Sequence, residues 1–152
     1  MPSPATPTNP PRFARPVLLA AAAYNVLWGA AVILFPDATL RLLGLPDATD
    51  FLWQCIGMIV GVYGIGYGIA AFDPRRHWPI VLVGLLGKLF GPVGFLDGAL
   101  RGDVPWSLGW TILTNDLIWW GPFALILRDA WSAGRTRRVV VTPTPALAEV
   151  SP

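Results

Sequence analysis

The chain has 152 residues, of which 54% are hydrophobic and 13% are charged, and its formal net charge is +2. The charged fraction is about half of that in soluble domains, and the apolar residues form blocks too long and too many for one soluble core. The composition therefore excludes an ordinary soluble domain and predicts an integral membrane protein.

Two residue counts exclude several redox functions. The single cysteine, Cys55, cannot form an internal disulfide or a Cys-x-x-Cys motif. The single histidine, His77, cannot supply the two axial ligands of a b-type haem. No set of metal ligands is visible, so we expect neither a metal nor a cofactor.

The ends of the chain are predicted to be disordered tails, residues 1–14 and 132–152. The first eleven residues include Pro2, Pro4, Pro7, Pro10 and Pro11. Proline lacks the backbone donor that a helix needs. The second tail alternates Thr and Pro over residues 142–145. A single transmembrane domain is expected between the tails, over residues 15–131.

Four apolar blocks in this domain match the length of a membrane-spanning helix, which takes about 20 residues for a hydrocarbon core about 30 Å thick. They cover about residues 16–35, 51–72, 79–100 and 107–127. A cleaved signal peptide is the alternative for the first block, because Arg12 and Arg15 precede its apolar run. The run continues to Leu34, past a plausible cleavage point, which favours a retained helix.

The placement of the arginines predicts the orientation, since cytoplasmic loops are enriched in Lys and Arg. The tails and the loop between the second and third blocks hold Arg12, Arg15, Arg75, Arg76, Arg128, Arg135, Arg137 and Arg138. The other loops hold only Arg41 and Arg101, beside Asp37, Asp47, Asp50 and Asp103. We therefore expect an all-α four-helix bundle with both termini on the cytoplasmic side. The expected interfacial tryptophans are Trp53, Trp106 and Trp110 outside, and Trp78 and Trp131 inside.

The loop between the first two blocks is predicted to contain a short outer interfacial helix. Asp37 can cap its start, and Gly44 can end it after Leu43. Its apolar residues Leu40, Leu42 and Leu43 are then available to lie on lipid.

Glycines line one face of each of the two middle blocks. The second block carries Gly57, Gly61, Gly64 and Gly68, and the third carries Gly84, Gly87, Gly91, Gly94 and Gly98. Small residues at a spacing of three and four let helix backbones approach closely in a membrane. The loop between these blocks is short, so the glycine faces are predicted to pack the two helices together as the spine of the bundle.

A polar cluster is predicted near the middle of the membrane. Lys88, the only lysine, and Asp116 each lie about nine residues into antiparallel blocks, which puts them at one depth. Asn25, Tyr63 and Asn115 fall near the same level. An unpaired charge there costs from about 2.5 to more than 10 kcal/mol, so an ion pair with polar partners is expected.

Proline and tryptophan flank this cluster. Pro92 removes the helical donor for the carbonyl of Lys88, and Pro122 removes the donor for Ile118. Kinks are expected at both prolines, with the freed carbonyls open to Lys88, water or a ligand. Trp119 and Trp120 lie one turn beyond Asp116 and can cover the cluster with an indole N–H or a ring face.

The chain resembles a group of small four-helix bacterial membrane proteins. The resemblance lies in Phe72-Asp73-Pro74-Arg75-Arg76-His77, in Gly84-Leu85-Leu86-Gly87-Lys88, and in Asn115-Asp116 with Trp119-Trp120. It covers about residues 15–130, and in size and layout the group is similar to the DoxX-like proteins. The resemblance implies a location in the bacterial inner membrane and supplies no catalytic residues. Some members are labelled alkyl hydroperoxide reductase, but this chain lacks the cysteines for that chemistry.

Three functional hypotheses remain open from the sequence. The first is a non-enzymatic accessory or scaffold protein in which Lys88 and Asp116 form a structural pair. The second is a binder or carrier of a lipid, a quinone, another small apolar molecule or protons. The third is an intramembrane enzyme with Asp116 as acid or base. The expected partners are the lipid bilayer and another membrane protein or a second copy of the chain, and no nucleic acid.

Overall fold

The computed structural model describes residues 10–45 and 49–141, with the side chains of all of these except 136–141. This part of the chain is all-helical. Its long helices are α1 (Ala14–Leu34), α3 (Asp50–Ala70), α4 (Trp78–Arg101) and α6 (Ile118–Val141). Its shorter elements are α2 (Pro36–Leu43), the 3-10 turn η1 (Trp106–Leu108), α5 (Gly109–Ile112) and the π-helical turn η2 (Leu113–Leu117). The predicted disorder of residues 1–9 and 142–152 concerns segments outside the described residues.

Three helices, α1, α3 and α4, are long and apolar enough to cross a membrane. Their bounds lie within two residues of the predicted blocks 16–35, 51–72 and 79–100. The long, apolar, proline-free centres of α1 and α3 explain this agreement, since sequence alone fixes such elements best. The fourth predicted block, 107–127, is divided among η1, α5, η2 and the start of α6.

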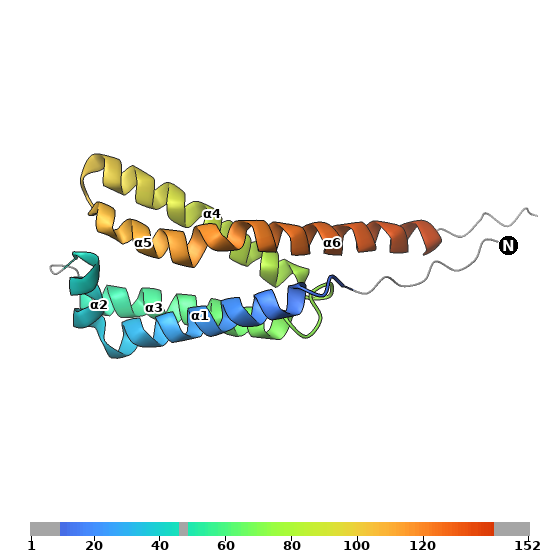
Figure 1. Cartoon of the computed structure of the whole chain (residues 1–152), viewed down its shortest axis with the longest axis horizontal. Helices are drawn as coiled ribbons and strands as arrows, with labels where there is room; N and C mark the ends of the chain where they lie inside the picture. The colour runs from blue at the N-terminus through green and yellow to red at the C-terminus, as the bar shows by residue number, and fades with distance from the viewer. Residues whose placement is uncertain (1–9, 46–48, 142–152) are drawn as a thin grey trace, which may run out of the picture.

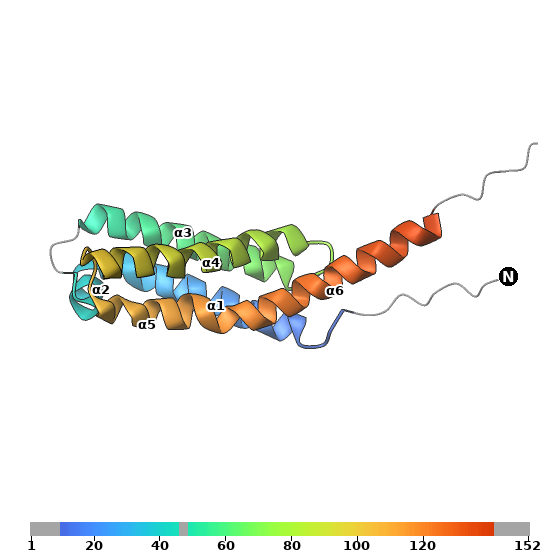
Figure 2. The ribbon, with the colours of Figure 1, turned by 90° about the horizontal axis from the view of Figure 1, so that it is seen from above.

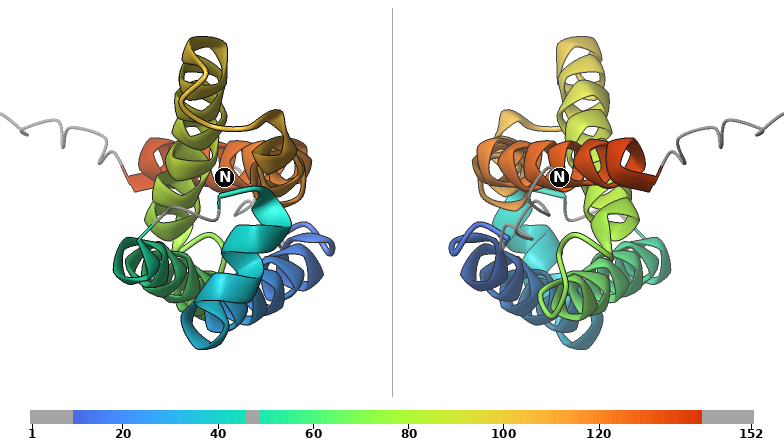
Figure 3. Two further views of the ribbon diagram at one scale, coloured as in Figure 1. Left: turned by 90° about the vertical axis from the view of Figure 1, so that its left-hand side faces the viewer. Right: turned by 90° about the vertical axis from the view of Figure 1, so that its right-hand side faces the viewer.

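The long helices α1, α3, α4 and α6 run along the long axis of the molecule, and each successive one reverses direction (Figure 1, Figure 2). The start of α1, the α3–α4 loop and the end of α6 lie at one end of the bundle. The short helix α2 and the turn between α4 and α5 lie at the other end (Figure 1). Helix α4 is inclined across the bundle, so that its C-terminal end lies far from α1 and α3 (Figure 3).

The glycine face of α3 packs against α1, so the prediction that it joins α3 to α4 is wrong. A Cβ atom added to Gly57 would lie 2.8 Å from Cγ1 of Val32 and 3.0 Å from the carbonyl oxygen of Gly29. A Cβ atom at Gly64 would meet Val26 and the carbonyl oxygen of Ala22. The pairing of α1 with α3 could not be predicted from glycine spacing, because α1 has one glycine at the contact and otherwise alanine and valine.

The glycines of α4 have several different neighbours. Gly84 packs against the ring of Tyr67, and Gly98 packs against Val104 after the end of the helix. Gly91 lies against the carboxylate of Asp116. A Cβ atom at Gly94 would have no neighbour within 4 Å. The regular glycine spacing of α4 therefore does not produce one continuous helix-packing face.

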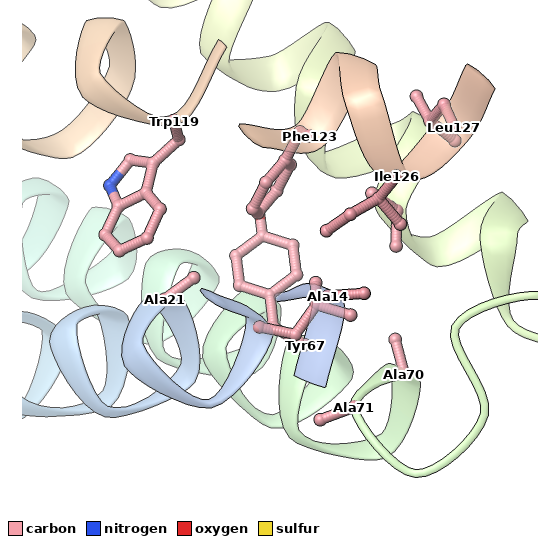
Figure 4. Close-up of a cluster of buried hydrophobic side chains, with 11 residues drawn as sticks. Ala14, Ala21, Tyr67, Ala70, Ala71, Trp119, Phe123, Ile126 and Leu127 are labelled. Carbon is pink, nitrogen blue, oxygen red and sulfur yellow. The ribbon is translucent and has the colours of Figure 1, made fainter. Parts of the chain in front are cut away.

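The main core lies between α1, the end of α3, the start of α4 and α6. Its aromatic centre is Tyr67, whose ring meets that of Phe123 edge-on at a centroid distance of 5.0 Å (Figure 4). Both side chains are almost wholly buried, as are Leu18 and Ile126. Buried alanines from α1 and from the end of α3 belong to the same cluster (Figure 4).

The short helix α2 forms as predicted, but it packs inward. Gly44 ends it in the left-handed conformation (φ 77°), a geometry that glycine adopts without strain. Asp37 lies in the first turn and makes no capping hydrogen bond, so the predicted cap is wrong. Leu40 and Leu43 are buried beside Val32, which leaves Leu42 as the exposed leucine. An eight-residue helix buries leucines three residues apart on a single face.

Trp53 was expected at the outer interface, but it is buried in a second apolar cluster with Val32, Leu40 and Leu43. Its indole Nε1 donates a hydrogen bond of 2.8 Å to the hydroxyl of Thr39 in α2. Its ring meets that of Trp28 edge-on at 5.6 Å. These contacts fasten α2 to the ends of α1 and α3.

The C-terminal helix is longer than predicted. α6 continues through Val141, ten residues past the predicted end of the transmembrane domain at residue 131. No proline occurs between Pro122 and Pro143. A helix already nucleated in the apolar block then extends by one backbone hydrogen bond per residue. The end of α6 projects beyond the rest of the bundle (Figure 1).

Candidate functional site

Lys88 lies at the centre of the predicted polar cluster. It projects from the middle of α4 and is 4% exposed. Its Nζ atom donates a hydrogen bond to the backbone carbonyl of Asn115, and it lies 3.9 Å from Oδ1 of Asp116. The ammonium group therefore bridges a main-chain dipole and a carboxylate. The structure thus brings together the two charged residues that the sequence placed at one depth.

The local backbone at Asn115 and Asp116 departs from an ordinary α-helix. Both residues lie in the π-helical turn η2, where the N–H of Ile118 bonds to the carbonyl of Leu113. In an α-helix that N–H would bond to Thr114, so the Thr114 carbonyl loses its usual donor. The indole Nε1 of Trp119 donates to it instead, at 3.2 Å. Isolated π turns within helices occur often at functional sites.

Asp116 is 6% exposed and is held by three neighbours. Its Oδ1 accepts a hydrogen bond of 3.1 Å from Nδ2 of Asn115 and faces the ammonium of Lys88. Its Oδ2 lies against Gly91, where a Cβ atom would be only 2.9 Å away. Glycine at this position makes the room that the carboxylate occupies.

Pro92 and Trp120 make possible a second contact between α4 and α6. Pro92 has no N–H with which to bond the carbonyl of Lys88, as the sequence predicts. The indole Nε1 of Trp120 donates to that carbonyl at 2.9 Å. Lys88 is thus an acceptor through its backbone and a donor through its side chain, both toward residues 115–120. α4 and α6 remain helical through Pro92 and Pro122.

Aromatic rings cover one side of the cluster. The ammonium of Lys88 lies 5.8 Å from the centroid of the Tyr67 ring, within the range of a cation–π contact. Tyr67 can approach α4 because Gly84 has no side chain. Trp119 and Phe123 lie beside the same ring (Figure 4). No sequence pattern indicates that Tyr67, one turn beyond Tyr63, lies beside the lysine.

Two predicted members of the cluster make no hydrogen bond to Lys88 or Asp116 within the described structure. Asn25 is buried, but its Nδ2 bonds at 2.7 Å to the carbonyl of Ala21 in its own helix. Tyr63 lies beside Gly87, with its hydroxyl 3.8 Å from the position of an added Cβ. Residue counts give the depth of a side chain in the membrane but not the direction in which it points. The predictions for Asn25 and Tyr63 failed for this reason.

Tyr24, which precedes Asn25, makes the connection from α1 that the sequence did not predict. Its hydroxyl donates a hydrogen bond of 2.8 Å to Oγ1 of Thr114. Oγ1 of Thr114 in turn donates to the carbonyl of Trp110 at 2.9 Å. Tyr24 therefore ties α1 to the π-helical turn. The sequence feature that could have indicated this bond is that Tyr24 and Thr114 lie at about the same depth on the first and fourth blocks.

The chemistry of the cluster is that of one cation, one carboxylate and their hydrogen-bond partners. Oδ1 of Asn115 is buried and has no hydrogen-bond partner among the described residues. No three His, Cys, Asp or Glu side chains gather as metal ligands within the described part of the chain. The arrangement can hold two charges together within the bundle, and it offers one free amide acceptor beside them.

A separate ion pair joins the α3–α4 loop to α6. Arg75 donates through Nε to Oδ2 of Asp129 at 2.8 Å and through Nη2 to Oδ1 at 3.0 Å. These hydrogen bonds raise the pKa of Arg75 above its usual value. The arginine is therefore charged throughout any working pH range, and the pair fixes this loop beside α6.

The resemblance to small DoxX-like membrane proteins stays a prediction, and the assignment of a function depends on the cluster itself. Protein-family models, curated proteins and solved structures gave no match to this chain.

Proposed function

We propose that this chain is a small multi-pass protein of the bacterial inner (cytoplasmic) membrane with a non-enzymatic accessory or scaffold function. In this proposal the cluster around Lys88 is a clasp that joins α4 to the stretch α5–η2–α6. The partners are bilayer lipids and another membrane protein or a second copy of the chain.

The outward faces of the helices support a membrane location. Large apolar side chains are exposed along α1, α3 and α4, for example Leu27, Val62 and Phe90 at 66–70%. A soluble protein rarely exposes so much contiguous apolar surface. In a membrane, lipid tails would cover these faces and keep the apolar side chains away from water.

Four crossings, with both termini in the cytoplasm, are the proposed topology. The fourth crossing would be α5–η2–α6, which runs antiparallel to α4 (Figure 1). The arginine-rich end of the bundle contains Arg15, Arg75, Arg76 and Arg128, and the opposite end contains Arg41 and Arg101 with Asp50 and Asp103. Positively charged segments stay preferentially in the cytoplasm.

The reciprocal bonding of Lys88 is the observation that carries the proposed clasp. Its ammonium reaches Asn115 and Asp116, while its carbonyl accepts from Trp120. The protein itself covers both charged groups, which are 4% and 6% exposed. Opposite charges that are enclosed in this way and paired with each other have a structural use without any substrate.

A second candidate function is a carrier of protons or a binder of a small hydrogen-bond donor. The observation in its favour is the buried Oδ1 of Asn115, which has no partner among the described residues. Buried acceptors are seldom left unsatisfied in proteins. This acceptor lies on the residue whose amide bonds to Asp116, so a donor bound there would be close to the carboxylate.

Removal and replacement of the pair test the clasp. Lys88→Met or Asp116→Leu alone leaves a buried charge without its partner, which costs about 3–5 kcal/mol of stability. The double variant replaces the pair with apolar side chains, and such replacements are often neutral. We expect each single variant to unfold more easily in detergent and the double variant to recover the stability of the wild type.

The same variants separate the two candidate functions in cells. A clasp predicts that the double variant complements a deletion strain as well as the wild type does. Recovered stability without complementation would assign the pair to proton or ligand binding instead. Failure of the double variant to recover stability would contradict the clasp.

Cysteine labelling tests the topology. With Cys55→Ser as background, Arg76→Cys, Asp103→Cys and Ser132→Cys introduce one thiol each at exposed positions. Four crossings predict that an impermeant maleimide reaches residues 76 and 132 only from the cytoplasmic side and residue 103 only from the other side. Labelling of residues 76 and 132 from opposite sides would rule out a fourth crossing.

A further inference from the structure

A hollow of about 190 Å³ lies at the arginine-rich end of the bundle, away from the Lys88 cluster. It lies where α6 extends past the other helices. Its lining residues are Trp78, Leu127, Ala130, Trp131, Gly134 and Arg135. The volume is below the roughly 300–1,000 Å³ of sites for whole drug-sized ligands, so the hollow suits one polar group of a larger molecule.

The walls of this hollow change from apolar to cationic along α6. Five lining residues of α6 are spaced three and four apart, which puts them on one face of the helix. They are Leu127, Ala130, Trp131, Gly134 and Arg135. Trp131 stacks on Trp78 of α4, with ring centroids 6.1 Å apart and planes at 27°. Paired indoles at the end of apolar helices are typical of the membrane interface.

Arg135 supplies the charge at the rim. Long side chains on a helix point back toward its N-terminus, which brings the guanidinium toward Trp131 and the bundle. None of the carboxylates in the described part of the chain pairs with Arg135, whereas Arg75 is engaged by Asp129. Arg135 therefore remains available for an anion, and a guanidinium binds phosphate well.

We propose that this hollow binds the phosphate-bearing headgroup of one anionic phospholipid in the cytoplasmic leaflet. The phosphate would pair with Arg135, the glycerol would lie against the stacked indoles, and the acyl chains would follow Leu127 along α6. The apolar-to-cationic order of the lining matches the order of these groups in a lipid. The proposal rests on the membrane topology proposed above and is independent of whether the Lys88 cluster is a clasp.

Native mass spectrometry of the detergent-extracted full chain tests this site with phosphatidylglycerol and phosphatidylcholine as probes. We expect the wild type to retain one phosphatidylglycerol about fivefold better than phosphatidylcholine, which is the order expected for one basic residue. Arg135→Gln should abolish the preference. Gly134→Leu should also abolish it, because Gly134 lines the hollow and a leucine there would take up space in it without changing the charge.

Arg76→Gln is the matched control, since it removes one exposed positive charge at the same end but does not line the hollow. It should keep the full preference. An equal loss in Arg76→Gln, or equal retention of both lipids by the wild type, would overturn the proposal. Displacement of the lipid by excess inorganic phosphate would also overturn it. A lipid-free dimer that Arg135→Gln dissociates would overturn it as well, because Arg135 would then bind a second copy of the chain. A wrong topology would instead appear in the cysteine labelling, so the two failures are distinguishable.

Discussion

The indole of Trp120 donates its hydrogen bond to the backbone carbonyl of Lys88, across the interface between α6 and α4. That carbonyl is open because Pro92, four residues later, has no N–H. A proline in one helix and a tryptophan in another therefore act together. The bond also fixes the backbone from which the Lys88 ammonium reaches Asn115.

Trp120→Phe should lower the free energy of unfolding by about 1 kcal/mol, because it leaves the Lys88 carbonyl without a donor while keeping an aromatic ring. Trp110→Phe is the control, since Trp110 is 71% exposed and its indole makes no hydrogen bond within the described structure. Equilibrium unfolding in mixed micelles measures both. An equal effect of the two substitutions would show that the Trp120 hydrogen bond contributes nothing.

Gly91→Ala should destabilise the protein by about 1–3 kcal/mol, in the range of other overpacked sites. The added methyl would lie 2.9 Å from Oδ2 of Asp116 and would push the carboxylate away from its place. Gly94→Ala, three residues further along the same helix, meets no atom within 4 Å and should be nearly neutral. Thermal unfolding in detergent compares them, and a greater loss in Gly94→Ala would contradict the packing described here.

The sequence predicts the elements of this fold better than their partners. Length and apolarity determine α1, α3 and α4, and residue counts from the two surfaces put Lys88 and Asp116 at one depth. The π-helical turn at Leu113–Leu117 could not be predicted, because no residue type requires it. Two carbonyls of the turn accept from side chains, that of Thr114 from Trp119 in α6 and that of Asn115 from Lys88 in α4. Likewise, the spacing of Gly57 and Gly61 does not reveal which helix they face.

The glycines of α3 provide a direct test of this difference between spacing and packing. Gly57→Ala should cost about 1–3 kcal/mol, since its methyl would meet Val32 and the Gly29 carbonyl at 2.8 and 3.0 Å. Gly61→Ala should be close to neutral, because an added Cβ there meets nothing within 4 Å. The two positions are equivalent by spacing. Equal losses of stability in the two variants would mean that glycine spacing, and not the observed α1–α3 contact, determines the effect of the substitution.

The hydrogen bond from Tyr24 to Thr114 should show measurable coupling between α1 and the π-helical turn. Tyr24→Phe and Thr114→Val each remove one partner and keep the side-chain shape, so their double-mutant cycle isolates the bond. Hydrogen bonds between membrane helices average about 0.6 kcal/mol and reach about 1.7, and we expect a value in this range. Tyr63→Phe replaces Tyr24→Phe in the control cycle, since Thr114 accepts from Tyr24 and makes no hydrogen bond to Tyr63 within the described structure. A coupling energy near zero in the first cycle, or an equal one in the control, would mean that Tyr24 does not hold the turn in place.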